Sequence, residues 1–233
     1  MRIHERLWQW LVRVGFRLLY NELAWTYDVV SWLVSLGEWR RWQLAALPFV
    51  AGPRVLEIAH GPGHMLLALA QDGYEVAGLD VSETMGRLAR RRLRRERVAP
   101  ALARGKVQQL PFPRQSFDTV LSTFPTAFIA ERATMVNVHR VLRPGGRFVI
   151  VPEGHLTGTS LLHRFIDWLF VITGQRQGTF AVDDERYWPE QSSLLRAFRK
   201  SMADLGFDLE VHHISLRRSA ATVVVATRQF EQC

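Results

Sequence analysis

The spacing of apolar and polar residues changes several times along the 233-residue chain. In residues 2–20, polar residues that are mostly arginines recur at steps of three and four, and leucine, tryptophan and valine occupy the other side. This period predicts an amphipathic helix. A second aromatic-rich helical stretch extends from about residue 25 to residue 46. We therefore expect residues 1–46 to form a helical N-terminal segment.

From residue 54 to residue 151, short apolar runs alternate with stretches of helical period. The expected strands cover residues 54–59, 74–79, 117–122 and 147–151, and the expected helices cover residues 65–71, 82–97 and 130–142. Turns rich in glycine or proline separate several of these elements. Strands that alternate with helices predict βαβ units and a parallel sheet, so the chain is expected to have an α/β fold.

The alternation ends after Val151. Residues 153–190 contain an apolar helical stretch at 161–172 and then a polar stretch with glycine and proline, which we interpret as an insertion over the active site. A helix at 192–205 and strands at 208–216 and 221–227 complete the chain, an order that predicts a reversed last hairpin. Residues 47–233 are therefore expected to form one domain that follows the N-terminal segment.

Composition limits the class of protein. With 48% apolar residues, the chain has enough material for one sizeable core. The single cysteine, Cys233, excludes a disulfide framework within one chain and fits a reducing cytoplasm. Arginines interrupt the N-terminal apolar stretch, and no apolar run reaches the length of a membrane span, so we expect neither a secretory signal nor a transmembrane helix. The net charge of +8 favours a polyanionic partner, either nucleic acid or anionic lipid.

The run from Val55 to Gly63 carries the main chemical signal. A strand ends there in a glycine turn that opens a helix, and glycine lets the backbone approach a ligand closely. Asp80 ends the next strand about 20 residues further on, where its carboxylate can accept hydrogen bonds from ribose hydroxyls. On this spacing alone, an ordinary turn between a strand and a helix remains the alternative.

Four runs in order resemble the motifs of class I S-adenosylmethionine-dependent methyltransferases. Residues 55–63 resemble motif I, residues 78–85 the ribose motif, residues 109–118 the approach to the fourth strand, and residues 139–147 the turn before the fifth. The resemblance implies a Rossmann-like fold with a mostly parallel seven-stranded sheet and a reversed last hairpin. It also implies S-adenosylmethionine as the cofactor and methyl transfer as the reaction, without a metal ion.

The resemblance assigns the methionine side of the cofactor to the glycine turn. Glu57 is expected to face the methionine amino group, and the backbone at Gly61 and Gly63 is expected to pass beside the cofactor. Ala59 stands where the family usually has glycine, and its extra methyl is tolerated if its φ is negative.

The resemblance also assigns the ribose and adenine side. Asp80 is expected to hold the ribose, with Val81 and Met85 beside the adenine. The other expected cofactor contacts are Gln108, Leu110 and Thr123. Lys106 stands where an acid often accepts the adenine amino group, so this contact is either absent or supplied by Gln108.

The N-terminal segment is more specific. Residues 24–42 are similar to the Tyr-Asp … Ser-x-Gly … Arg-x-Trp segment of the ubiquinone and menaquinone biosynthesis C-methyltransferases, to which bacterial phospholipid N-methyltransferases are related. In such enzymes this segment covers the cofactor, so Tyr27 is the candidate to cover its methionine end. Alternatively, Tyr27 and the tryptophans are packing residues. Residues 122–128 depart from the run that the quinone enzymes carry after the fourth strand.

Three interpretations of function remain. The acceptor is a lipophilic molecule, such as a quinone precursor or a phospholipid headgroup, or it is a soluble small molecule. The third interpretation, a non-enzymatic nucleic-acid binder that uses the arginine-rich helix at 87–97, is disfavoured because no aromatic residues are interleaved with the arginines. His155 is the candidate general base and Glu153 the alternative. The histidines have no metal-ligand spacing, and a structural role is expected for most of them.

The first helix also predicts a location. Its arginine stripe and apolar face are typical of a helix that lies on an anionic membrane surface, although the apolar face can instead pack on the domain. We therefore expect a cytoplasmic protein that binds the inner face of the membrane peripherally through residues 1–20, with a small-molecule or lipid acceptor.

Overall fold

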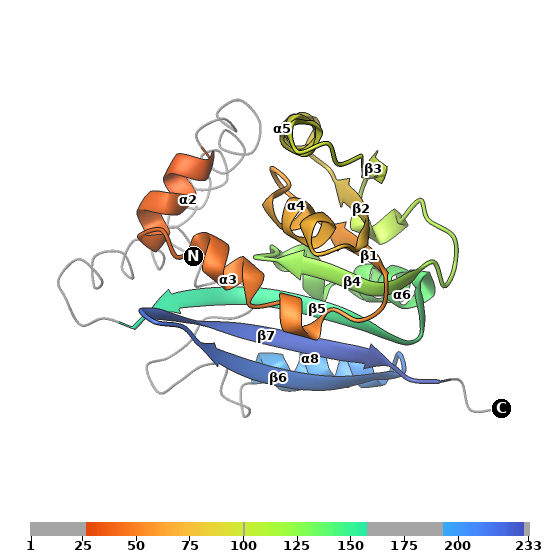
Figure 1. Cartoon of the computed structure of the whole chain (residues 1–233). Coiled ribbons are helices and arrows are strands. Elements are labelled where there is room, and N and C mark those ends of the chain that lie inside the picture. The colour runs from red at the N-terminus through yellow and green to blue at the C-terminus, as the bar shows by residue number, and fades with distance from the viewer. Residues whose placement is uncertain (1–26, 100, 158–192, 231–233) are drawn as a thin grey trace, which may run out of the picture.

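The computed structural model describes residues 27–99, 101–157 and 193–230. One seven-stranded sheet organises them, in the order β3-β2-β1-β4-β5-β7-β6 (Figure 1). The strands are β1 (Arg54–Ile58), β2 (Glu75–Asp80), β3 (Ala101–Arg104), β4 (Phe117–Thr123), β5 (Leu142–Leu156), β6 (Phe207–Ser215) and β7 (Ser219–Arg228). Only β7 runs antiparallel to its neighbours, β5 and β6. The expected α/β fold with a reversed last hairpin is confirmed.

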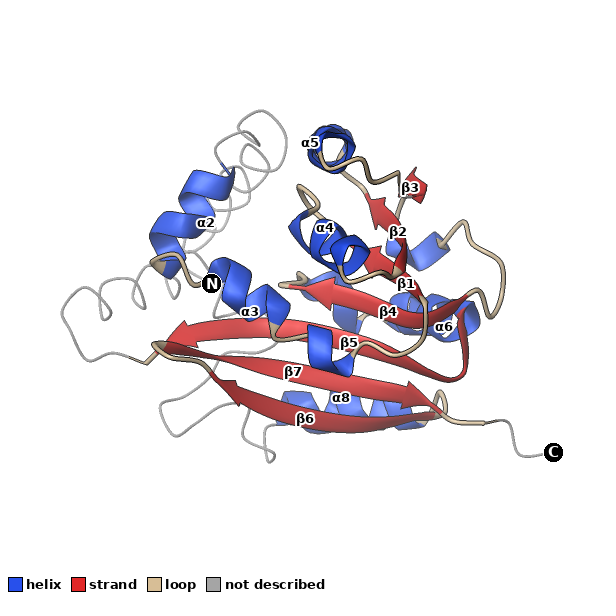
Figure 2. Ribbon diagram, viewed as in Figure 1, coloured by secondary structure: helices blue, strands red, loops and turns tan. Residues whose placement is uncertain are grey.

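Helices cover both faces of the sheet (Figure 2). They are α2 (Tyr27–Ser35), α3 (Trp39–Leu44), α4 (His64–Gln71), α5 (Glu83–Arg95), α6 (Arg132–Val141) and α8 (Ser193–Ala203). Short 3-10 turns occupy Leu47–Phe49, Val107–Gln109 and Ala127–Ala130. Side chains of α3 and α4 pack on one face of the central strands, and side chains of α6 and α8 pack on the other. The central strands are apolar on both faces for this reason, as parallel strands between two helical layers must be.

The second N-terminal helix is shorter than its sequence period predicts. The stretch expected to be helical from about residue 25 to residue 46 is split into α2 and α3 at Leu36 and Gly37, which have φ values of +50° and +85°. Two consecutive left-handed residues cannot continue a right-handed helix. Ser35 then accepts the backbone N–H of Trp39 through its Oγ at 3.0 Å, which anchors the first turn of α3.

Two strands also differ from the sequence prediction. The short edge strand β3 was not located by apolar spacing, because it has only four residues and none is fully buried. The fifth strand was expected at 147–151 but extends from Leu142 to Leu156. β7 pairs with it as far as Leu156, well past the last residue that pairs with β4. The partner strand, rather than the local sequence, sets this length.

None of the helices in the described ranges is long and apolar enough to cross a bilayer. The expected helices at 2–20 and 161–172 lie outside the described residues.

Candidate functional site

The segment that joins β1 to α4 turns through two left-handed glycines. Gly61 has a φ of +53° and Gly63 a φ of +81°, a conformation that favours glycine. A Cβ on Gly63 would lie 2.8 Å from the Cβ of Ala89, so this glycine lets α4 and α5 pack closely. A Cβ on Gly61 would meet no protein atom within 4 Å. The backbone at Gly61 therefore borders open space, as a ligand-binding turn requires.

Ala59 also lies in the left-handed region, with a φ of +54°. The condition under which the extra methyl would be tolerated, a negative φ, is therefore not met. Ala59 donates its N–H to the carbonyl of Leu79 at 2.7 Å, and the chain leaves the sheet at that point. The turn therefore has a strained residue where glycine would carry no strain.

Asp80 joins two turns with one carboxylate. Its Oδ2 accepts the N–H of Gly61 at 2.9 Å, and its Oδ1 accepts the N–H of Ser82 at 2.8 Å. The side chain is nearly buried at the end of β2. A carboxylate has lone pairs beyond these two bonds, so Asp80 can both fix the turns and accept a ligand hydroxyl.

Glu57 is a buried carboxyl group with an unused acceptor. It lies on β1 with 1% of its surface exposed, and its Oε2 has no hydrogen-bond partner among the described residues. Burial raises the pKa of Glu57 well above its usual value, and the negative charge of Asp80 raises it further. A cationic ligand group would supply the missing partner and favour the ionised form.

His60 has a structural position in the turn. Its Nδ1 lies 2.7 Å from the carbonyl oxygen of Gly61, and the ring is almost fully buried. Burial lowers the pKa of His60, so the ring is uncharged at neutral pH. In the described part of the chain, no cluster of three or more histidine, cysteine, aspartate or glutamate side chains is placed to hold a metal ion.

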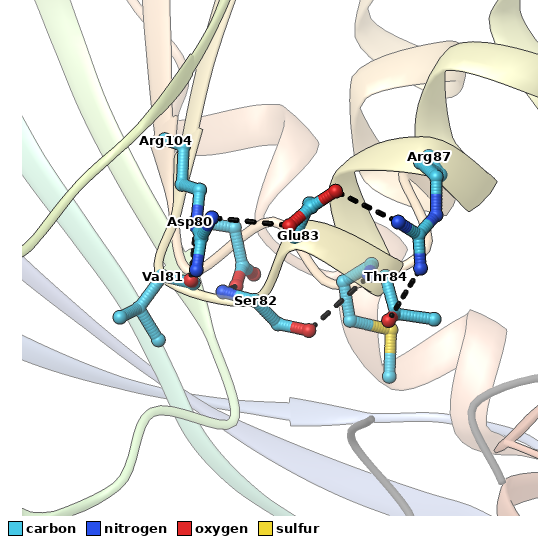
Figure 3. A network of polar contacts seen from close by, with 8 residues as sticks. Asp80, Val81, Ser82, Glu83, Thr84, Arg87 and Arg104 are labelled. Atoms are coloured by element: carbon cyan, nitrogen blue, oxygen red, sulfur yellow. Dashed lines mark hydrogen bonds and ion pairs between the residues drawn. The ribbon is translucent and has the colours of Figure 1, made fainter. Parts of the chain in front are cut away.

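Ion pairs and a hydrogen bond of charged side chains connect the turn after β2 to its neighbours (Figure 3). Arg104, the last residue of β3, donates its Nε to the carbonyl of Val81 at 3.2 Å and forms an ion pair with Glu83 at 3.1 Å. Glu83 in turn pairs with Arg87 at 2.8 Å. The network contacts Val81 only through its backbone carbonyl, and 62% of the residue is exposed.

The other residues expected beside the adenine are less open. Met85 is fully buried, and Leu110 is buried in the core. The amide of Gln108 donates to the carboxylate of Glu131 at 2.7 Å. Val81 is thus the exposed member of this group, and contacts of Met85, Gln108 and Leu110 with a cofactor stay predictions.

Side-chain contacts hold helix α2 against the glycine turn. Asp28 binds His64 at 2.8 Å, at the start of α4, and Arg92 at 2.6 Å, on α5. Arg92 also donates to the carbonyl of Pro62 within the turn. The hydrogen bond from His64 is the main reason that the pKa of Asp28 is lowered, although partial burial opposes it. We call the group Asp28, His64 and Arg92 the α2 latch.

The helix α3 covers the end of β4. Gln43 donates its Nε2 to the Oγ1 of Thr123 at 3.1 Å, and the Trp39 ring stacks on Phe124 with centroids 4.0 Å apart. Phe124 has a φ of +51°, so the chain turns sharply directly after β4. The carboxyl ends of β1, β2 and β4 lie at one edge of the sheet, where open α/β sheets bind their ligands. We call the glycine turn with Asp80 the first wall of this candidate site, and α2 with α3 its second wall.

The three candidate catalytic residues are less closely defined. Tyr27 is the first residue of α2, and its side chain lies outside the described part. Glu153 and His155 were expected after the fifth strand, but both lie within β5. A Cβ on Gly154, between them, would collide with the Trp42 ring. Because side chains alternate along a strand, Glu153 and His155 face the other side of the sheet from Trp42. Their catalytic roles stay predictions.

Sequence reasoning did not identify the residues that fasten the second wall. Asp28 directly follows Tyr27 in the segment compared with the quinone enzymes, and this position in the motif was the one available signal. Gln43 and Arg92 gave no signal, because their partners lie 80 and 64 positions away in the chain.

Known proteins are similar to this chain in sequence and in fold. The family model described as a methyltransferase domain matches residues 55–146. A demethylmenaquinone methyltransferase of Symbiobacterium thermophilum is 32% identical, over 92% of this chain and 93% of that protein. The enzyme of the same name from Renibacterium salmoninarum is 27% identical, over 92% and 91% of the two chains.

Solved structures show the same fold at lower identity. A SAM-dependent methyltransferase from Thermotoga maritima is 20% identical, with a TM-score of 0.59 over 91% of this chain and 99% of that one. A phosphoethanolamine N-methyltransferase of Haemonchus contortus is 19% identical, with a TM-score of 0.57 over 83% and 53%.

Proposed function

The chain belongs to the S-adenosylmethionine-dependent methyltransferases, and we propose that its methyl acceptor is a lipophilic quinone precursor. One observation carries the proposal. The match to a demethylmenaquinone methyltransferase extends over 92% of the chain, so it includes wall-forming residues outside the common methyltransferase domain. An acceptor preference is a property of those outer parts, because the cofactor is shared by enzymes with many acceptors.

The first wall has the groups that the cofactor needs. We assign Glu57 to its ammonium group, Asp80 to its ribose hydroxyls and the backbone at Gly61 to close approach. Val81 is the exposed candidate for the adenine side. Bound S-adenosylmethionine supplies an electrophilic methyl group on a sulfonium. The protein then has to orient the acceptor and exclude water.

The second wall supports an apolar, flat acceptor. Trp39 and Phe124 form an aromatic stack directly after β4, and Trp42 is in edge contact with the same Phe124 ring. Aromatic rings favour stacked or edge contacts with another ring. Gln43 fixes this stack to the sheet through Thr123, which we also retain as a cofactor contact.

A quinone precursor requires loss of a proton when its ring accepts a methyl group. We retain Tyr27, Glu153 and His155 as candidates for the general base. The hydroxyl of Thr222 lies 3.5 Å from the Glu153 carboxylate, so that carboxylate has a polar neighbour within the sheet.

A soluble small-molecule acceptor is the second candidate. Residues 122–128 differ from the corresponding run of the quinone enzymes, and Phe124 lies within this run. A phospholipid headgroup is a third acceptor of the same reaction class. All three candidate acceptors require the same cofactor contacts in the first wall.

Labelled cofactor separates these acceptors. The protein is incubated with labelled S-adenosylmethionine and, in separate reactions, with a short-chain demethylnaphthoquinol, phosphatidylethanolamine and a fractionated soluble extract. We expect label in the naphthoquinol. Label in phosphatidylethanolamine or in a soluble fraction, with none in the naphthoquinol, would replace the quinone assignment.

Two further features stay proposals. One is the division into a lid of residues 1–46 and a catalytic domain of residues 47–233. The other is peripheral binding to the inner face of the membrane through residues 1–20, which lie outside the described part of the chain.

A further inference from the structure

The helix α2 has an exposed apolar face. Val29, Trp32 and Leu33 have exposed fractions of 58%, 61% and 55%, and Leu36 directly after the helix has 38%. These four residues make up most of the seven large apolar side chains that are exposed in the described part of the chain. Ser31 and Ser35 are buried on the inner side of the same helix. The helix therefore presents its apolar side outward, the reverse of an ordinary surface helix.

The helix α5 has an exposed cationic face. Arg90, Arg91, Arg94 and Arg95 are all exposed, while Met85, Ala89 and Leu93 are buried on the inner side. Within the described ranges, these four arginines form no ion pair. An acidic neighbour three or four positions away would stabilise an arginine on a helix surface, as Glu83 does for Arg87.

The two faces belong to one end of the molecule. Figure 1 shows α2 and α5 at the end of the structure away from β6. The ion pair between Asp28 and Arg92, at 2.6 Å, joins the two helices directly. The exposed apolar residues of α2 and the unpaired arginines of α5 thus belong to two helices that are joined to each other at one end of the molecule. We call the two faces together the α2–α5 surface.

We propose that the α2–α5 surface docks on an anionic lipid bilayer. Tryptophan and leucine enter the boundary between headgroups and acyl chains, and arginines remain at the level of the lipid phosphates. A nucleic acid would account for the arginines alone and would leave the apolar face in water. This surface differs from residues 1–20, and it does not depend on which acceptor is methylated.

Vesicle sedimentation with the full-length chain tests the proposal. Vesicles of phosphatidylcholine alone and of phosphatidylcholine with phosphatidylglycerol are compared at low and high salt, without cofactor or acceptor. We expect binding to the anionic vesicles that high salt weakens. The pair R91E and R95E, and separately the pair W32S and L33S, should each lower the partition coefficient about tenfold.

Matched variants elsewhere control for charge and hydrophobicity. R199E with K200E reverses two exposed charges on α8, and V136S removes an exposed apolar side chain from α6. Both should bind vesicles like the unaltered protein. Thermal unfolding and S-adenosylhomocysteine binding of each variant show that the fold and the cofactor site are intact, so failure of docking is distinct from failure of the proposed function.

Four results would overturn the proposal. The first is that the unaltered protein stays in the supernatant with anionic vesicles at low salt. The second is that both α2–α5 variants bind these vesicles as the unaltered protein does. The third is that deletion of residues 1–20 abolishes binding while the α2–α5 variants retain it, which would assign docking to the first helix. The fourth is that the arginine variant loses binding to duplex DNA but not to vesicles, which would assign the arginines to nucleic acid.

Discussion

The two walls of the site are built in different ways. In the first wall, the contact that sets the geometry of the glycine turn joins the backbone N–H of Gly61 to Asp80, 19 positions away. In the second wall, Asp28 of α2 and Gln43 of α3 contact residues 64 and 80 positions away. Glu38, directly before α3, accepts a hydrogen bond from the hydroxyl of Ser219, 181 positions away.

This difference separates a cofactor-binding turn that many enzymes can share from side-chain contacts that are particular to this chain. A backbone turn held by one carboxylate needs few specific side chains, so it can serve one cofactor in enzymes with many acceptors. Long-range side-chain pairs depend on both partners, and one change can release an element. We therefore expect variants of the first wall to act mainly on cofactor affinity. Variants of the second wall should act mainly on turnover.

The largest effect is expected for Gly61→Val. A branched side chain there would occupy the open space next to the turn, so S-adenosylhomocysteine binding should weaken by about 3 kcal/mol or more, roughly a hundredfold. Gly73→Val is the matched control, because Gly73 also has a left-handed φ and no atom within 4 Å of a Cβ. Both variants should lose about 1–2 kcal/mol of stability from the unfavourable φ. Calorimetry and thermal unfolding measure the two effects, and equal binding by the two variants would show that the open space is not the cofactor site.

Glu57→Gln is expected to have a smaller effect, which weakens ligand binding but stabilises the cofactor-free protein. Binding of S-adenosylhomocysteine should weaken by about 1–3 kcal/mol, because the ammonium group loses a charged partner. The cofactor-free variant should be more stable than the unaltered protein at neutral pH, because the native pKa of Glu57 is raised above its ordinary value of 4.5. The unaltered protein loses stability as pH rises through that raised pKa, and the difference vanishes below the ordinary value.

Unfolding temperatures measured with and without ligand from acid to neutral pH test both parts. A variant that is less stable than the unaltered protein at neutral pH would contradict the interpretation of Glu57 as a buried carboxyl group with an unused acceptor. Glu75→Gln, on the exposed start of β2, is the control for loss of a carboxylate.

The smallest effect on stability is expected for Asp28→Asn in the α2 latch. Asp28 is half exposed, so the loss should stay below about 1 kcal/mol. Turnover should fall further than stability, since α2 would no longer be held against the glycine turn. The pKa of Asp28 is lowered from 3.8, so the stabilisation from the latch is present above that pH and is lost as pH falls through the lower native pKa.

Initial rates and unfolding temperatures of Asp28→Asn are compared with those of Asp204→Asn, an exposed aspartate after α8. If Asp28→Asn lowers cofactor affinity as strongly as Gly61→Val, the division of labour between the two walls is wrong.

The sequence by itself determined most strands of the sheet, the glycine turn and the position of Asp80. These features follow from apolar periods and from glycine, which act over a few residues and are therefore visible in the local sequence. The order of motifs also indicated the methyltransferase family, which the comparisons confirm.

Only the tertiary structure decided how the second wall is held. The ion pairs of Asp28, the contact between Gln43 and Thr123, and the full length of β5 depend on partners that are distant in sequence. The left-handed φ of Ala59 likewise depends on where β1 leaves the sheet, since alanine has no local preference for that conformation. Local sequence determines which element a residue joins, but a contact between distant segments exists only after the chain has folded them together.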